Sequence, residues 1–90
     1  MNLEFAHTGD LYIADFTANA DFNLHIEQET KGFVDVYQSG ISDGKYDMVK
    51  ALSHTYNEVV DVDCTALIYP KYIRVVLRNE PNKAVVTFAE

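Results

Sequence analysis

The chain has 90 residues, with 14 acidic and seven basic side chains, a net charge of −7 and one cysteine. The length corresponds to one domain. A composition of 48% hydrophobic and 23% charged residues excludes a disordered chain, a collagen and a coiled coil. Lysine and arginine are too sparse for a duplex nucleic-acid binder, which needs clustered cations to displace counterions. No apolar run approaches the roughly 18 residues of a membrane-spanning helix, so we expect no membrane insertion. The first residues lack the basic and apolar regions of a signal peptide, which leaves the compartment open.

Alternation of apolar and polar residues predicts antiparallel strands along most of the chain. In residues 21–27, for example, Phe22, Leu24 and Ile26 share one face and the polar residues between them share the other. The same pattern predicts a short first strand at residues 3–6 and further strands at residues 10–17, 33–38, 59–69, 72–78 and 83–88. Residues typical of turns separate most of these segments, which favours strands joined by short connections.

The apolar faces of these strands predict one shared core. We expect it to contain Phe22, Leu24, Ile26, Val34, Val36, Val60, Val62, Cys64, Ile73, Val75, Leu77, Val86 and Phe88. Seven or eight short strands at this spacing predict an all-β fold, a single antiparallel β-sandwich of jelly-roll type over residues 1–90.

The segment from residue 42 to residue 58 fits two structures. Tyr46 and Val49 begin a helical spacing of apolar residues, whereas Tyr46 and Met48 begin an alternating one. No capping box follows the Ser-Asp-Gly turn that opens the segment, which favours a strand and a loop. The alternative is an α+β fold with one short helix near residues 46–58.

No catalytic or metal-binding constellation is predicted. His7, His25 and His54 lie far apart in the sequence, and none has another histidine two or four residues away. Asp61 and Asp63 share a strand face, which we interpret as solvated because no loop nearby supplies further oxygen ligands. The lone cysteine excludes an internal disulfide, and no cofactor motif occurs, so we expect no cofactor and a protein that is not an enzyme.

Aromatic and arginine side chains on outward strand faces are the candidate binding residues. They are Tyr37, Tyr69, Tyr72, Arg74 and Arg78. Interface centres are enriched in such side chains, and sugars stack on exposed aromatic rings. These residues therefore predict binding of a protein or of a carbohydrate.

Two segments resemble the galactose-binding-like, discoidin-type jelly-roll domains. Residues 36–49 resemble a strand, a Ser-Asp-Gly turn and a second strand of that family, and residues 70–76 resemble its late aromatic-Ile-Arg strand. The resemblance implies an antiparallel jelly-roll sandwich and binding rather than catalysis. It assigns no ligand-binding residue in this chain.

The distribution of charge adds a hypothesis about self-association. Four of the seven basic residues fall in residues 70–90, whereas the rest of the chain is strongly acidic. We expect a module for assembly or structural interaction, and the alternative is a module that binds carbohydrate or another surface ligand. In an assembly, Arg74 and Arg78 would contact the face of a neighbouring copy that carries Asp61 and Asp63. The competing hypothesis is that Arg74 and Asp61 lie on neighbouring strands and pair within one molecule.

Overall fold

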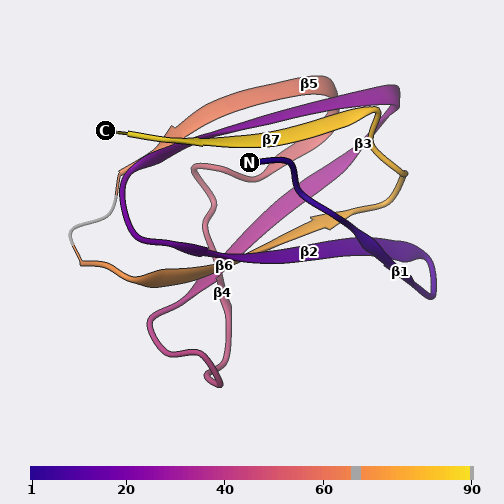
Figure 1. Cartoon of the computed structure of the whole chain (residues 1–90). Coiled ribbons are helices and arrows are strands. Elements are labelled where there is room, and N and C mark those ends of the chain that lie inside the picture. The colour runs from indigo at the N-terminus through magenta and orange to yellow at the C-terminus, as the bar shows by residue number, and fades with distance from the viewer. Residues whose placement is uncertain (66–67, 90) are drawn as a thin grey trace.

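The protein is described from a computed structural model of residues 1–65 and 68–89, without the side chains of residues 31 and 54–57. The predicted all-β fold is confirmed, because the described residues form strands and no helix (Figure 1). The strands are β1 (Ala6–Thr8), β2 (Leu11–Ala18), β3 (Phe22–Ser39), β4 (Asp47–Met48), β5 (His54–Cys64), β6 (Lys71–Leu77) and β7 (Lys83–Phe88). No helix long and apolar enough to cross a membrane occurs among these residues.

Strand β3 belongs to two antiparallel sheets that pack as a sandwich. Its first half pairs with β5 on one side and β7 on the other, which makes a three-stranded sheet. Its second half pairs with β6 and β4 in a five-stranded sheet of order β1-β2-β6-β3-β4. With β3 counted in both sheets the sandwich has eight strands, within the predicted seven or eight.

The continuity of β3 differs from the predicted pair of strands at residues 21–27 and 33–38. Its register with β5 shifts between Glu27 and Gly32 and again before Val34. Such irregularities bend a strand without ending it, so β3 passes from one sheet into the other. Gly32 suits this bend because a Cβ atom there would lie 2.6 Å from the side-chain nitrogen of Asn79.

The helix near residues 46–58, the alternative structure for this segment, is wrong. The segment forms β4, a turn and the start of β5. Within the turn, the amides of Leu52 and Ser53 donate to the Val49 carbonyl at 3.0 and 3.1 Å, which is a helix-like turn that does not propagate. The Ser53 side chain then takes the place of a backbone partner for β3, because its Oγ accepts a hydrogen bond from the Val36 amide at 2.9 Å.

Two predicted strands lie at different positions from those expected. The first strand lies at residues 6–8 because Gly9, with a φ of 60°, closes a tight hairpin in which Thr8 pairs with Leu11. The strand expected at residues 59–69 begins at His54 and ends at Cys64. The part of that prediction at residues 66–67 lies outside the described residues.

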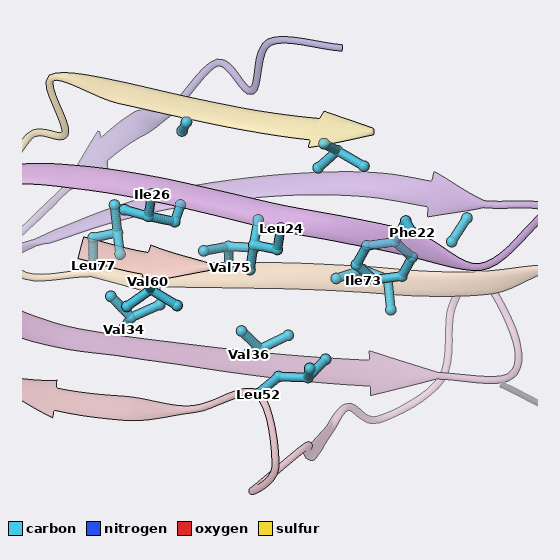
Figure 2. Close-up of a cluster of buried hydrophobic side chains, with 13 residues drawn as sticks. Phe22, Leu24, Ile26, Val34, Val36, Leu52, Val60, Ile73, Val75 and Leu77 are labelled. Carbon is cyan, nitrogen blue, oxygen red and sulfur yellow. The ribbon is translucent and has the colours of Figure 1, made fainter. Parts of the chain in front are cut away.

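The core lies between the two sheets, and most of its predicted members are buried. Figure 2 shows side chains from both halves of β3 gathered with those of β6. Ten of the thirteen predicted residues are buried, with at most 3% of each exposed: Phe22, Leu24, Ile26, Val34, Val36, Val60, Ile73, Val75, Leu77 and Val86. The predicted core residues Val62, Cys64 and Phe88 are only half-buried against it. Val62 and Cys64 belong to β5, which among the described residues has a neighbouring strand on one side only.

We expect Leu24→Ala to lower the free energy of unfolding by about 2–5 kcal/mol, because Leu24 is fully buried between the sheets. The control is Val59→Ala on β5, where the side chain is 60% exposed and the expected change is under about 0.5 kcal/mol. Urea unfolding of the two variants measures the difference. Equal losses would contradict this assignment of the core.

Candidate functional site

Four of the five predicted binding residues lie on the outer face of the five-stranded sheet. Tyr37 comes from β3, Tyr72 and Arg74 from β6, and Arg78 directly follows β6. The period of two explains this placement, because the residues that alternate with them on β6 point into the core. Tyr37 and Arg74 are direct cross-strand neighbours, so two of the predicted residues are in register with each other.

Tyr69 does not lie on this face, and its contacts indicate a role in the packing of the fold. Its ring packs against the hydrophobic core before β6 begins, and its hydroxyl donates a hydrogen bond to the carboxylate of Asp21. The sequence could not separate Tyr69 from the other aromatic residues, because this contact joins segments far apart in the chain.

Arg74 is the centre of the outer face. Its Nε and Nη2 donate to the two carboxylate oxygens of Asp15 at 2.8 and 3.0 Å, and Asp15 is its direct neighbour on β2. The ring of Tyr46 lies over the guanidinium, with its centroid 4.4 Å from Cζ. The hydrogen bond to Asp15 raises the pKa of Arg74 above its ordinary value. The guanidinium is therefore charged and held in one orientation.

The loop between β3 and β4 is folded back over this face by Ser39 and Gly44. The Ser39 hydroxyl accepts from the Ile41 amide at 3.2 Å and donates to the Ile41 carbonyl at 2.7 Å. The Gly44 amide donates to the same carbonyl at 3.2 Å and closes the predicted turn. A Cβ atom at position 44 would lie 2.5 Å from Cγ1 of Ile41, so glycine lets the loop pack this tightly.

A groove of about 730 Å³ lies between the loop and the sheet. Its apolar lining residues are Leu11, Ile13 and Val76. The other lining residues are the polar and aromatic Asp15, Tyr37, Ser42, Asp43, Lys45, Tyr46 and Arg74, with Gly44. An apolar concave surface with a few fixed polar groups is the usual composition of a ligand site of this size.

The sequence predicted Tyr37 and Arg74 but missed the partners that complete the groove. Asp15 approaches Arg74 because β2 and β6 are neighbours, although they are distant in the sequence. Tyr46 approaches it because the loop after β3 returns across the sheet. The Ser-Asp-Gly motif predicts a turn in this loop, but it does not predict which face of the sheet the loop covers.

Arg78 is an exposed cation of the same face. Its guanidinium lies 5.2 Å from the ring centroid of Phe33, a cation–π contact between β3 and the end of β6. No ion pair within the described part of the chain includes Arg78. Tyr72 lies on the face outside the residues that line the groove.

The outer face of the three-stranded sheet carries a hydrogen-bonded acidic network. His25 places Nε2 2.7 Å from Oε2 of Glu27 and Nδ1 3.4 Å from Oδ2 of Asp61. The side-chain nitrogen of Asn23 donates to Oδ1 of Asp61 at 2.7 Å and to Oδ1 of Asp63 at 3.0 Å. The predicted common face of Asp61 and Asp63 is confirmed, and both carboxylates have partners on β3.

The hydrogen bonds of this network favour the charged forms of His25, Glu27 and Asp61. The hydrogen bond to Glu27 raises the pKa of His25, and the same bond lowers the pKa of Glu27. The hydrogen bond from Asn23 lowers the pKa of Asp61. A carboxylate at each ring nitrogen favours the imidazolium form of His25, which suits a structural cation better than a catalytic base.

The remaining histidines and the cysteine do not form a site within the part of the chain that the structure describes. Over the described side chains, no three His, Cys, Asp or Glu residues are arranged to hold a metal ion. His7 stacks on Tyr12, with ring centroids 4.3 Å apart, and the side chain of His54 lies outside the described residues. Burial raises the pKa of the Cys64 thiol, which makes it a poor nucleophile.

No protein-family model, curated protein or solved structure matches the chain. The resemblance to discoidin-type domains stays a prediction.

The His25 network predicts a pH dependence of stability. Because the folded state raises the pKa of His25 from 6.5, its contribution is complete below pH 6.5 and is lost as the pH rises through the raised value. The lowered pKa values of Glu27 and Asp61 add stability above their ordinary values of 4.5 and 3.8, and this is lost as the pH falls. We expect the free energy of unfolding of the wild type to exceed that of His25→Gln by the largest amount between about pH 4.5 and 6.5.

Urea unfolding at about pH 5.5 and about pH 8.5 measures the effect, which should shrink at the higher pH and in high salt. Glutamine is the suitable replacement because it keeps a hydrogen-bond donor but carries no charge. A difference between the two proteins that is equal at both pH values would contradict a charged His25.

Proposed function

We propose that this protein is a non-enzymatic interaction module that acts in an assembly and binds a partner protein through the outer face of its five-stranded sheet. The observation that carries the proposal is the fixed position of Arg74, held by Asp15 and Tyr46 at the wall of a groove. Arginine and tyrosine are the residues that most often anchor protein interfaces.

The groove is organised before a partner arrives. Ordering a long side chain at an interface costs about 0.5–1.5 kcal/mol, and Arg74 is already ordered by two hydrogen bonds and one ring. The Arg74 side chain is still 38% exposed, so an incoming group can reach it. The apolar lining residues Leu11, Ile13 and Val76 add hydrophobic surface that a partner can bury, which the Arg74–Asp15 pair alone does not supply.

The placement of the charged faces supports self-association in which the arginine face of one copy contacts the Asp61 and Asp63 face of the next, a head-to-tail contact. The predicted internal pair of Arg74 with Asp61 is wrong, because β3 separates β6 from β5 and Arg74 pairs with Asp15 instead. Arg78 and the face with Asp61 and Asp63 lie on the outer faces of different sheets, on opposite sides of the sandwich. Each copy would then use one side to contact the copy before it and the other side to contact the copy after it. Such a contact can be repeated from copy to copy, so it produces a ring or a filament.

We expect the wild type to self-associate at low salt and Arg78→Glu to weaken that association, because the substitution reverses the charge of an exposed cation on this face. The matched control is Lys50→Glu, which makes the same charge change at an exposed residue of the turn after β4. Sedimentation at about 100 μM detects contacts with Kd in the micromolar range. A monomeric wild type, or an Arg78→Glu protein with an unchanged oligomer, would contradict this form of assembly.

Carbohydrate binding is the second candidate, and the shape of the groove favours it. Tyr37 and Tyr46 offer aromatic surface, and Ser42 and Asp43 offer groups that hydrogen-bond to sugar hydroxyls. A volume of about 730 Å³ is in the range of sites for small organic ligands.

A glycan array separates the two candidates, with Tyr37→Ala and Tyr72→Ala as a matched pair. Both tyrosines lie on the same outer face, but only Tyr37 lines the groove. If the groove binds sugar, we expect Tyr37→Ala to abolish the array signal and Tyr72→Ala to preserve it. Absence of glycan binding by an oligomeric wild type would leave assembly as the function.

A further inference from the structure

The edges of the two sheets are covered unequally. Residues 1–3 run beside β7, where the Val86 amide donates to the Met1 carbonyl at 2.7 Å and the Leu3 amide to the Ala84 carbonyl at 2.9 Å. The edge strands of the five-stranded sheet are short, with three residues in β1 and two in β4. Strand β5 has eleven residues and pairs only with β3 among the described residues (Figure 1).

The uncovered side of β5 is a template for another strand. An edge strand presents alternate N–H and C=O groups that have no partner in their own sheet. The inner face of β5 is also incompletely covered, because Val62 and Cys64 are half-buried although they pack against the core. A strand placed beside β5 would cover these two side chains and complete the core at this edge.

The acidic side chains of β5 leave the edge open. Asp61 accepts hydrogen bonds from Asn23 and lies against His25, and Asp63 accepts a second hydrogen bond from Asn23. Both of these partners belong to β3, so the carboxylates are drawn toward β3 and away from the free side of β5. Val59, on the same outer face, is 60% exposed.

A second copy of this chain is a poor occupant of the edge. Antiparallel pairing of two β5 strands would bring Asp61 and Asp63 of each copy onto one common sheet face. Like charges on facing strands are destabilising, and each chain already carries a net charge of −7. The same carboxylates attract a strand of opposite charge.

We propose that the free edge of β5 binds an extended segment of a partner protein in which basic and apolar residues alternate. The segment adds a fourth strand to the three-stranded sheet through main-chain hydrogen bonds. Because side chains alternate between the two faces, its lysine or arginine residues lie beside Asp61 and Asp63, and its apolar residues lie beside Val62 and Cys64. This site is on a different sheet from the groove, but the proposed self-association also uses the face with Asp61 and Asp63. Peptide binding is therefore measured at a salt and protein concentration at which sedimentation shows a monomer, which keeps the two tests separate.

The probe is a capped peptide of about seven residues with alternating lysine and valine, a length that spans a typical strand. Its control has the same composition with the lysines and valines in separate blocks. We expect fluorescence anisotropy to give a Kd at least about tenfold lower for the alternating peptide, because only that order matches both faces. We also expect slower amide hydrogen exchange in residues 58–64 when the peptide is bound.

Two double variants with the same change of net charge test the position of the site. Asp61→Asn with Asp63→Asn should weaken binding by about fivefold or more, and asparagine can still accept the hydrogen bonds from Asn23. Asp35→Asn with Asp47→Asn, on the five-stranded sheet, should have less than about a twofold effect.

Backbone N-methylation of the peptide tests strand addition itself. Methyl groups on every second residue should be tolerated in one frame and should abolish binding in the other, because only alternate amides face β5. Equal affinity for both peptide orders, equal effects of the two double variants, or protection of amides outside β5 would overturn the proposal. Dimerisation of the free protein through β5 would also overturn it and identify a second copy as the occupant.

Discussion

The fold depends on the bend in β3. This strand contributes Phe22, Leu24 and Ile26 to one layer of the sandwich and Val34 and Val36 to the other, so a single element supplies both sides of the core. The bend lies where the pairing with β5 loses register, between the two halves. Four other strands, β4, β5, β6 and β7, take their places by pairing with β3, and the remaining two follow through β6.

The two outer faces of the sandwich have different electrostatic character because of this arrangement. On the five-stranded sheet, Asp15 pairs with Arg74 and an aromatic ring contacts each arginine, beside a groove that combines apolar, aromatic and polar lining residues. On the three-stranded sheet, the carboxylates outnumber the cations and are held by Asn23 and His25. One face therefore suits a ligand that buries surface, and the other suits a partner of positive charge.

Much of the fold could be predicted from alternation alone. Where a strand has one buried face, as in β6 and β7, each residue is assigned to a face by its position, and the predicted inward residues Ile73, Val75 and Leu77 are buried. The prediction was poorer where the pattern is interrupted by polar or small residues. Gln28 and Gly32 continue the inward face through the bend, and in the sequence they resemble a break between two strands.

The sequence by itself determined the class of the fold, the inward and outward sides of its strands and the outward position of Tyr37, Tyr72, Arg74 and Arg78, because these follow from a local period of two. Only the tertiary structure decided what surrounds those residues. Strand order placed Asp15 beside Arg74, the loop after β3 brought Tyr46 over it, and the absence of a neighbour beyond β5 in the described chain left Val62 and Cys64 half-buried. These contacts join segments distant in the sequence, and no local pattern encodes which strands become neighbours.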